Sequence, residues 1–484
     1  MRFDLSSFVS AMPEIFILSM ACIILLMDAF LPKQYRRILP YLLVQATLIG
    51  AFFLAIVQFG AYPSPLLSFS RQYVLDDLAV TSKVFVYLFG FFAFAYAREY
   101  IEARKIPVSE YYLLGLFSIL GMSIMVSAYS FLSIYLGLEL LSLPLYAMVA
   151  MNRESNASTE AAMKYFVLGA LASGLLLYGI SLLYGVTGSI QMDTVANVLQ
   201  SKHNLVAVVA MIFILGGLIF KFGAVPFHMW VPDVYQGAAT PTTLFIASAP
   251  KVATFAMTLR ILAEALPSLE VYWVQILIVI SVLSMLFGNL LAIAQTNLKR
   301  MLAYSSIAHI GYTLLGIIAG PDSTLGYSSA MFYITTYVLV AAGAFAIITI
   351  MSRNGIELDH LEDYRGLNAR NPWLAFMMLL LLFSMAGVPP MVGFFAKLGL
   401  LEALVQAHFV WLAVLALLFA LVGVYYYLRV VMLMYFEEPV EAVAHTPIIV
   451  SSNMMTMISL NGVAALLLGL LPSFFIDICR ISVS

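Results

Sequence analysis

Lysines inside apolar runs are the residues of this chain best suited to chemistry. Lys221 lies in GGLIFKFGAVPFHMWVPDVYQGAATP, five residues before Pro226. A charge at membrane depth costs a few kcal/mol on insertion scales and usually marks an ion or proton pathway. A proline in the same helix frees backbone groups, which must be satisfied by protein or by a water-filled cavity. Together these features predict a hydrated point inside a bilayer that binds and releases a proton.

A glutamate and two further lysines have similar surroundings. Glu139 lies near the middle of FLSIYLGLELLSLPLYAMVA, and we expect its carboxylate to tune how readily Lys221 releases a proton. Lys251 in SAPKVATF and Lys397 in VPPMVGFFAKL each follow prolines, which makes them candidates for later proton stations. The alternatives are a structural carboxylate for Glu139, a helix-joining ion pair for Lys251, and a side chain that extends to the membrane surface for Lys397.

Three more residues could act on this path or support the structure. Lys164, in STEAAMKYFVLGA, is a few residues into its apolar run, so it either modulates the path or extends to the inner surface. His309, in AYSSIAHIGYTLLG, can both donate and accept a proton and would suit a relay between lysines, or it is a satisfied core histidine. His228, in VPFHMW, is either a relay residue or a helix cap.

Composition limits the class of protein. The chain has 484 residues, of which 63% are hydrophobic and 10% charged, whereas about 25% are charged in soluble domains. This predicts an all-α polytopic membrane protein. The net charge of −2 gives no reason to expect a nucleic-acid partner. The two cysteines, Cys22 and Cys479, form no CxxC motif, and there is no dinucleotide or P-loop motif, so we expect no cofactor or metal on this chain.

The elements that position these residues are fourteen predicted membrane spans joined by short connections. The first is expected to be a retained helix that ends at the basic PKQYRR segment rather than a cleaved signal. The spans are predicted at 12–31, 38–59, 79–97, 110–127, 129–150, 162–184, 205–227, 239–263, 271–294, 301–319, 327–350, 373–405, 409–434 and 453–478.

Basic residues predict the orientation, because cytoplasmic loops are enriched in lysine and arginine. With both termini outside, the inner side would hold Lys33, Arg36, Arg37, Arg98, Arg104, Lys105, Arg153, Lys299, Arg300, Arg353, Arg365, Arg370 and Arg429. The outer side would hold the smaller set Arg2, Arg71, Lys83, Lys202, Arg260 and Arg480. An even number of spans also requires the two termini to share a side, so both arguments place them outside.

Two spans are interrupted, which suggests an internal repeat. The seventh is expected to break at Pro226, and the twelfth, 373–405, is too long for one straight crossing and contains two consecutive prolines. Paired interrupted helices are typical of inverted repeats around a midplane path. We therefore expect three N-terminal helices in 1–109, one repeat in 110–263, a second in 271–434 and a last helix in 453–484.

Three motifs carry a resemblance to a known family. They are KFGAVPFHMWVPDVYQGAATP, QTNLKRMLAYSSIAHIGY and the YRGL…MAGVPPMVGFFAKL tract. These resemble the antiporter-like subunits of respiratory complex I, the proton-pumping NADH:quinone oxidoreductase, and the similarity covers essentially the whole chain. Subunits of this family differ in the charged residue on the twelfth span and in whether a lateral helix follows the fourteenth. Lys397, and the few residues left after the fourteenth span, favour the type that has a lysine on the twelfth span and no lateral helix.

The resemblance implies fourteen helices in two inverted five-helix repeats around a hydrated polar axis. It implies that Glu139 and Lys221 form a pair that Lys164 modulates, and that Lys251 and Lys397 lie further along the path. It also implies a bacterial inner-membrane location, with an M-type antiporter-like subunit on one side and small K/J-type subunits on the other. NADH, FMN, iron–sulfur clusters and quinone would be bound by other subunits.

The expected function is therefore proton translocation coupled to electron transfer from NADH to quinone, within a translocase that has no redox centre on this chain. A proton from Lys221 would pass through water, Lys251 and His309 to Lys397 and leave outward. One alternative is a subunit of a multi-subunit sodium/proton antiporter, which has the same fold. Another is a structural membrane subunit through which no ions pass.

Overall fold

A computed structural model describes residues 5–30, 32, 35–60, 65–201, 204–352, 357–439, 448 and 450–483. Arg2, Lys33, Lys202 and Arg353, which contributed to the predicted orientation, lie outside these residues. The described chain is almost entirely helical, and it divides into two compact units. The first comprises Met1–Phe222 and Ala249–Ile276, and the second comprises Gly223–Ser248 and Leu277–Ser482.

The first unit contains a small antiparallel hairpin, in which Leu66 pairs with Leu75 and Ser68 with Tyr73. Its strands and helices are β1 (Leu66–Ser68), β2 (Tyr73–Leu75), α1 (Leu5–Ser10), α2 (Met12–Phe30), α3 (Leu39–Gln58), α4 (Asp77–Ala103), α5 (Val108–Val126), α6 (Phe131–Val149), α7 (Asn156–Thr187), α8 (Met192–Ser201), α9 (Leu205–Phe222), α12 (Ala249–Leu259), the π-helix η1 (Arg260–Ala265) and the 3-10 helix η2 (Pro267–Leu269).

Helix α13 (Glu270–Ile293) begins in the first unit and ends in the second. The remaining elements belong to the second unit, except that Val483, the last residue of α21, is grouped with the first. They are α10 (Trp230–Gly237), α11 (Thr240–Ile246), α14 (Leu298–Ala319), α15 (Gly326–Met351), the 3-10 helix η3 (Leu361–Tyr364), α16 (Leu367–Arg370), α17 (Pro372–Ala386), α18 (Val392–Gln406), α19 (Val410–Phe436), α20 (Ser452–Leu470) and α21 (Pro472–Val483).

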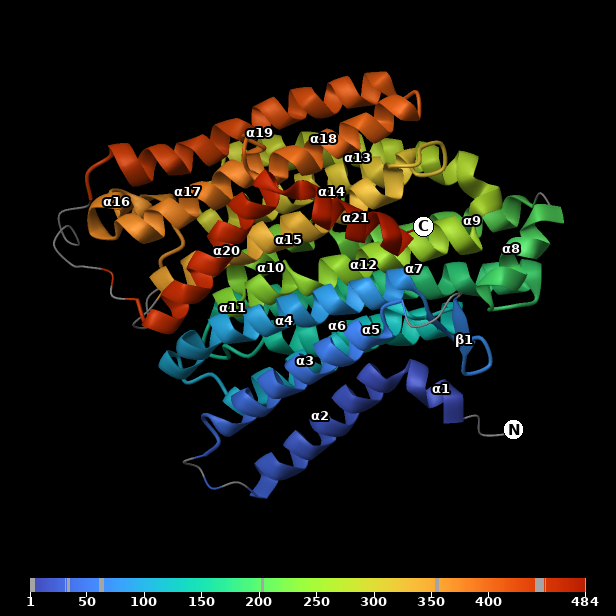
Figure 1. Ribbon diagram of the computed structural model, residues 1–484, viewed down its shortest axis with the longest axis horizontal. Coiled ribbons are helices and arrows are strands. Elements are labelled where there is room, and N and C mark those ends of the chain that lie inside the picture. Colours follow the sequence, from blue (N-terminus) through green and yellow to red (C-terminus); the bar gives the residue numbers. More distant parts are fainter. Residues whose placement is uncertain are drawn as a thin grey trace. The chain divides into compact units, whose positions relative to one another are not determined.

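The predicted all-α membrane fold is confirmed. Thirteen helical segments among the described residues are long and apolar enough to cross a membrane, and α17 is a shorter apolar helix. Within each unit the axes of most long helices are roughly aligned (Figure 1). This arrangement suits a bilayer, because a helix satisfies its own backbone hydrogen bonds where no water is available.

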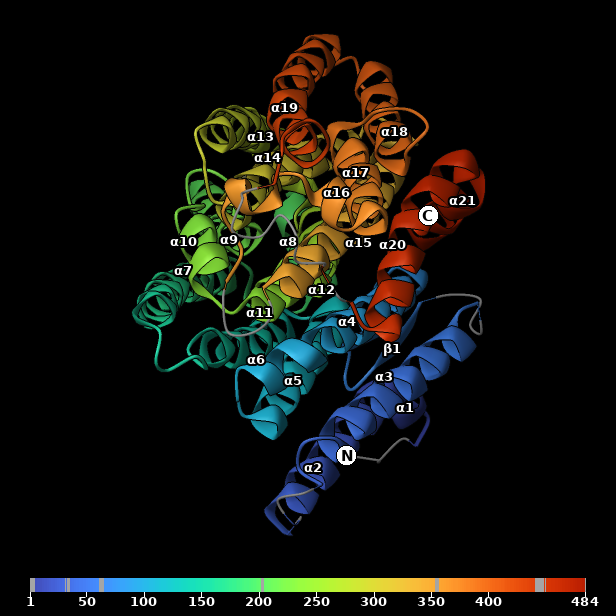
Figure 2. The ribbon, with the colours of Figure 1, turned by 90° about the vertical axis from the view of Figure 1, so that its left-hand side faces the viewer.

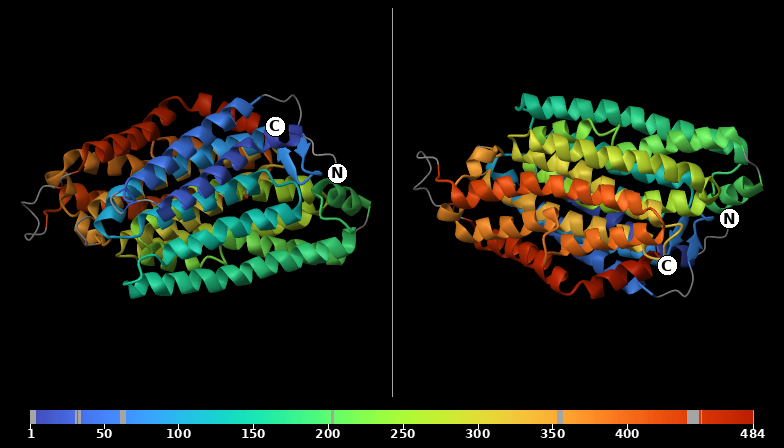
Figure 3. Two further views of the ribbon diagram at one scale, coloured as in Figure 1. Left: turned by 90° about the horizontal axis from the view of Figure 1, so that it is seen from below. Right: turned by 90° about the horizontal axis from the view of Figure 1, so that it is seen from above.

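Burial differs between helices in a way that fits a membrane bundle. In the second unit, α15 packs against α11, α14, α17, α18 and α20, and it is buried almost all round (Figure 2). In the first unit, α7 packs along α9 and α6 (Figure 3). Its opposite face exposes apolar side chains such as Met163, Phe166 and Leu171, which makes this face suitable for contact with lipid or another subunit.

Both predicted interruptions are present, but one lies earlier than expected. Helix α9 ends at Phe222 rather than continuing to 227, because Gly223 has φ +75°, a left-handed conformation that ends a helix. The twelfth span is split into α17 and α18, of 15 residues each. Each is about 22 Å long at 1.5 Å per residue, too short for a hydrocarbon core of about 30 Å, so one crossing needs both.

Candidate functional site

Lys221 lies in the last turn of α9 and contacts α6. Its side chain is buried, and Nζ donates a hydrogen bond to Ser142 Oγ at 2.7 Å. The Ser142 hydroxyl donates its own hydrogen to Leu138 O at 2.6 Å. Only the lone pairs of Oγ therefore remain for the lysine, so Ser142 is well suited to accept a hydrogen bond from an ammonium group.

Glu139 lies three residues before Ser142, which places both on the same face of α6. Its Oε1 atom is buried and has no hydrogen-bond partner in the described part of the chain. The Glu139 carboxylate is near enough to Lys221 for their charges to interact, but among the described residues no ion pair joins them. Glu139 and Lys221 are therefore neighbours, as predicted, but the Lys221 ammonium donates its hydrogen bond to Ser142.

A small cavity adjoins Lys221 between α6, α7 and α9. Its volume is about 10 Å³, close to the minimum that one water molecule needs. Its polar lining comes from Ser142, Tyr146, Ser173 and Lys221. This polar lining makes the cavity suitable for a water molecule that exchanges a proton with the lysine.

Lys251 lies in α12 and caps the interrupted end of α9. Its Nζ donates to Phe222 O at 2.5 Å, and Phe222 is the last residue of that helix. Carbonyls in the last turn lack an intrahelical partner and carry the negative end of the helix dipole. These carbonyls therefore offset part of the cost of burying a lysine cation at this position.

Lys397, in α18, makes the same kind of contact in the second unit. Its Nζ donates to Met385 O at 3.1 Å and to Ala386 O at 2.9 Å, the last two carbonyls of α17. Gly387 follows with φ +85°. A Cβ added there would lie 2.9 Å from Lys397 Cδ and 3.2 Å from Nζ, so the lysine passes where only glycine leaves room.

His309, in α14, lies between tyrosines. Its Nδ1 is 2.6 Å from Tyr333 Oη, its Nε2 is 3.0 Å from Tyr427 Oη, and its ring stacks on Tyr337 at a centroid distance of 4.5 Å. Ser305 continues the chain of hydroxyls from Tyr427. A neutral imidazole donates through one nitrogen and accepts through the other, so this arrangement can conduct a proton.

His309 and Lys397 line one cavity, which has a volume of about 10 Å³. Tyr333, Tyr337 and Ser384 supply the other main polar groups of its wall. The structure therefore brings together two of the residues that the sequence selected separately. Each unit has a cavity of this size beside a lysine near an interrupted helix.

Lys164 and His228 have different surroundings. The Lys164 side chain is 43% exposed and pairs with Glu160 at 2.7 Å. Helix α7 begins at Asn156, six residues before the predicted start, so Lys164 is further into its helix than expected. His228 lies between α9 and α10, where burial lowers its pKa and favours the neutral imidazole. Its Nδ1 atom has no hydrogen-bond partner among the described residues.

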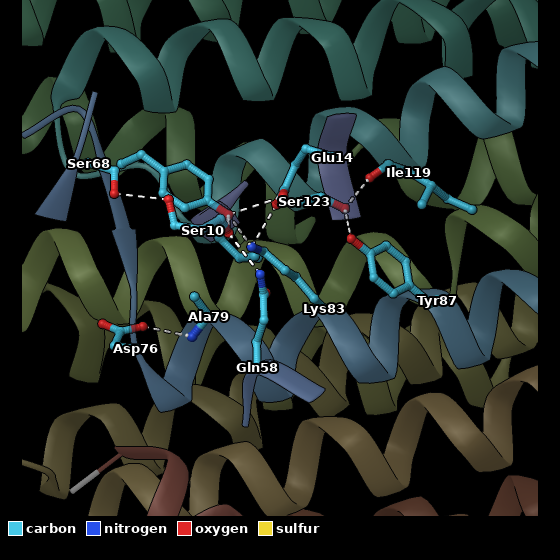
Figure 4. A network of polar contacts seen from close by, with 12 residues as sticks. Ser10, Glu14, Gln58, Ser68, Asp76, Ala79, Lys83, Tyr87, Ile119 and Ser123 are labelled. Atoms are coloured by element: carbon cyan, nitrogen blue, oxygen red, sulfur yellow. Dashed lines mark hydrogen bonds and ion pairs between the residues drawn. The ribbon is translucent and has the colours of Figure 1, made fainter. Parts of the chain in front are cut away.

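Sequence reasoning missed two buried cations of the first unit, having assigned Lys83 and Arg260 to the outer side. Lys83 is fully buried, 2.6 Å from Glu14 Oε1, and donates to Tyr73 Oη at 2.6 Å (Figure 4). Arg260 is fully buried and bound to Asp76. The available signal was that Lys83 is the fifth residue of the predicted span 79–97 and so lies inside the span rather than in the loop before it.

Comparisons with known proteins match most or all of the chain. The transmembrane family model of NADH:quinone oxidoreductase and Mrp antiporter subunits matches residues 128–423. The NADH-quinone oxidoreductase subunit N of Coxiella burnetii is 52% identical over 97% of this chain and 98% of its own length. That of Thioalkalivibrio sulfidiphilus is 50% identical over the full length of both.

Solved structures show the same fold. A chain of respiratory complex I from Thermus thermophilus with bound aureothin is 32% identical, with a TM-score of 0.82, over 96% of this chain and 98% of that one. A chain of the Mrp complex from Dietzia sp. has a TM-score of 0.85 over 98% of this chain and 97% of that one, at 21% identity. The second similarity concerns the fold alone.

Proposed function

Because the chain belongs to the family of NADH-quinone oxidoreductase subunit N proteins, we propose that it translocates protons as a membrane subunit of such an enzyme. The observation that best supports this function is the repeated arrangement in the two units. Each has a lysine, buried in the first unit and half-buried in the second, beside a cavity of about 10 Å³ at an interrupted helix. Lysine, hydroxyl and imidazole groups with room for water can pass protons without any redox centre on this chain.

In the first unit, Glu139 and Lys221 are the proposed loading site. Movement of the Lys221 ammonium from Ser142 toward the unpartnered Glu139 Oε1 atom would strengthen its charge pairing. Movement back would weaken that pairing and favour release of the proton to water or to Lys251. Lys164 would modulate the site from α7, and His228 would exchange protons where the seventh span is interrupted.

In the second unit, His309 and Lys397 are the proposed exit stations. The proton would reach His309, pass through the shared cavity to Lys397 and leave outward. Moving one charge against about 100 mV costs about 2.3 kcal/mol. A change of roughly two pKa units at one station, at 1.36 kcal/mol per unit, supplies this energy.

The proposed surroundings rest on the distribution of basic residues and on the family resemblance. The chain would lie in the inner membrane of a bacterium with both termini on the outer side. Its neighbours would be other complex I subunits, an M-type antiporter-like subunit on one side and K/J-type subunits on the other. Electrons from NADH would pass through FMN and iron–sulfur clusters to quinone in those other subunits, and quinone reduction would shift the Glu139–Lys221 pair. The expected inverted repeats, 110–263 and 271–434, belong to this proposal.

The alternative is a subunit of a sodium/proton antiporter. The Mrp complex has the same fold along nearly the whole chain. This function would require sodium for transport and no NADH dehydrogenase partners. The proposed function is preferred because the relatives near 50% identity are NADH-quinone oxidoreductase subunits.

The test is NADH-driven acidification of inverted membrane vesicles carrying Lys221→Ala. We expect the complex to assemble while acidification and coupled NADH oxidation collapse, because the loading site has lost its proton carrier. Lys105→Ala is the matched control, since this lysine is exposed beyond the end of α4 and should leave both rates unchanged. Wild-type acidification by an assembled Lys221→Ala complex would support the structural alternative and contradict the proposed path.

A further inference from the structure

The end of α12 holds a charged cluster that the proposed path does not use. The helix continues as the π-helix η1, and π-helical turns inside α-helices are frequent at functional sites. Arg260, the first residue of η1, is only 1% exposed. Its Nη1 and Nη2 atoms each donate to a different carboxylate oxygen of Asp76 at 2.9 Å, and Nη2 also reaches Val126 O at 3.4 Å.

A second carboxylate shares this guanidinium. Glu264, one turn further along η1, accepts from Arg260 Nη1 at 2.9 Å. Its side chain is 36% exposed, against 18% for Asp76, so Glu264 extends from the buried arginine to the surface. Two carboxylates on one guanidinium leave one negative charge without compensation.

The geometry distinguishes the two carboxylates. Asp76 binds both terminal nitrogens of Arg260 and also accepts from Ala79 N at 2.9 Å, capping α4 (Figure 4). Burial raises the pKa of Asp76, but Arg260 lowers it more, so it stays below its ordinary value. Asp76 is therefore ionised across the neutral range. Glu264 accepts a single hydrogen bond, from Arg260 Nη1, which also donates to Asp76. Glu264 is therefore the carboxylate that takes up a proton.

Among the described residues, two neighbouring cations are already paired with other carboxylates. Two pairs in the same unit cancel internally, Glu14 with Lys83 at 2.6 Å and Arg71 with Asp193. The titratable and charged groups nearest this cluster in sequence or by contact come from α2, the hairpin, α4, the α5–α6 turn, α8, α12 and the start of α13. They are Glu14, Arg71, Tyr73, Asp77, Lys83, Tyr129, Asp193, Lys251, Glu270 and Tyr272.

We propose that Glu264, held by Arg260 and Asp76, is a proton-binding residue where the first unit exchanges protons with the aqueous phase. Binding converts its carboxylate to the carboxylic acid, and the charge of the three-residue cluster changes from −1 to 0. Arg260 can still donate to the carbonyl oxygen of the acid. This inference rests on the proposed function, in which Lys251 is a proton station on the same helix, thirteen residues or about 20 Å away at 1.5 Å per residue.

The first experiment is infrared spectroscopy of the purified complex across neutral pH, comparing wild type with Glu264→Gln. We expect a protonated-carboxyl band in the wild type that is lost in Glu264→Gln and retained in Asp322→Asn. Asp322 is an exposed carboxylate between α14 and α15 and is the matched control. Retention of every carboxyl band in Glu264→Gln overturns the proposal. If that variant fails to assemble, Glu264→Asp replaces it, and the proposal requires this variant to keep a band that is shifted in pH.

NADH-driven acidification of vesicles is the second readout. Loss of acidification in assembled Glu264→Gln, with recovery in Glu264→Asp, is the expected result, because the shorter side chain still titrates. Wild-type acidification by Glu264→Gln would overturn the role in transport. Failure of this inference is distinguishable from failure of the proposed function, because the infrared band requires no transport, whereas the Lys221→Ala test does not involve Glu264.

Discussion

One hydroxyl group determines where the ammonium of Lys221 rests. Ser142 accepts its hydrogen bond at 2.7 Å, one helical turn from the unpartnered oxygen of Glu139. A hydrogen bond to a charged group contributes about 1.5–3 kcal/mol. We therefore expect Ser142→Ala to slow NADH-driven acidification about tenfold, since 1.4 kcal/mol corresponds to a factor of ten. The measurement is the initial rate of acidification in vesicles with an equal content of assembled complex.

The conservative variant separates this role from a packing role. Ser142→Thr keeps the hydroxyl and adds a methyl group next to a cavity of about 10 Å³, so most of the rate should be retained. If Ser142→Thr and Ser142→Ala lose the rate equally, the hydroxyl does not position the lysine.

Charge and depth selected titratable residues that lie beside polar groups in the structure, but they did not identify the partners of these residues. Lys221, Lys251 and His309 are buried beside polar groups, as their positions in apolar runs predicted, and Lys397 is half-buried beside two backbone carbonyls. The partners of His309 could not be predicted, because Tyr427 is 118 residues away in the sequence and the contact depends on how two helices rotate. Lys83 was missed because it was treated as an outer-side anchor.

At the scale of elements, the two interruptions have the same construction. In each, an α-helix ends before a glycine with positive φ, Gly223 or Gly387, and a lysine donates to carbonyls of the helix's last turn. Lysine protonation and the geometry of the helix end are therefore linked. A neutral amine would interact less favourably with the negative end of the helix dipole than an ammonium does.

Gly387→Ala tests this linkage. A left-handed conformation costs a non-glycine residue about 1–2 kcal/mol, and the new Cβ would meet the Lys397 side chain at 2.9 Å. We expect reduced acidification from a displaced Lys397, measured against the amount of assembled complex. The matched control is Gly174→Ala in α7, where a Cβ meets nothing within 4 Å and helix propensity should improve. Equal rates for both variants would contradict the linkage.

Prolines predicted which spans are interrupted, but glycine conformation decides where one helix ends. The expected break at Pro226 lies four residues after Phe222, because Gly223 already ends α9. The prediction for the twelfth span was more accurate, since Gly387 and the two prolines lie together between α17 and α18. Hydropathy does not show at which residue each helix ends, because both spans are apolar on each side of the glycine.

At the scale of the whole molecule, one cavity in each unit is better suited to a proton than to a sodium ion. Each has a volume of about 10 Å³, and each is lined by a lysine side chain, Lys221 in one and Lys397 in the other. A sodium ion requires several oxygen ligands and would be repelled by an ammonium group. A proton needs only a chain of titratable groups and water. The arrangement beside these two lysines therefore favours protons over sodium.

Removal of sodium is the corresponding test. We expect NADH-driven acidification of vesicles to be the same in sodium-free buffer and in buffer with sodium at equal ionic strength, because none of the proposed stations supplies a sodium site. A proton uncoupler should abolish the acidification in both buffers. Vesicles with Lys221→Ala, examined in both buffers, exclude a contribution from unrelated sodium pumps. A requirement for sodium that disappears in Lys221→Ala would show that this chain transports sodium, and the antiporter alternative would replace the proton path.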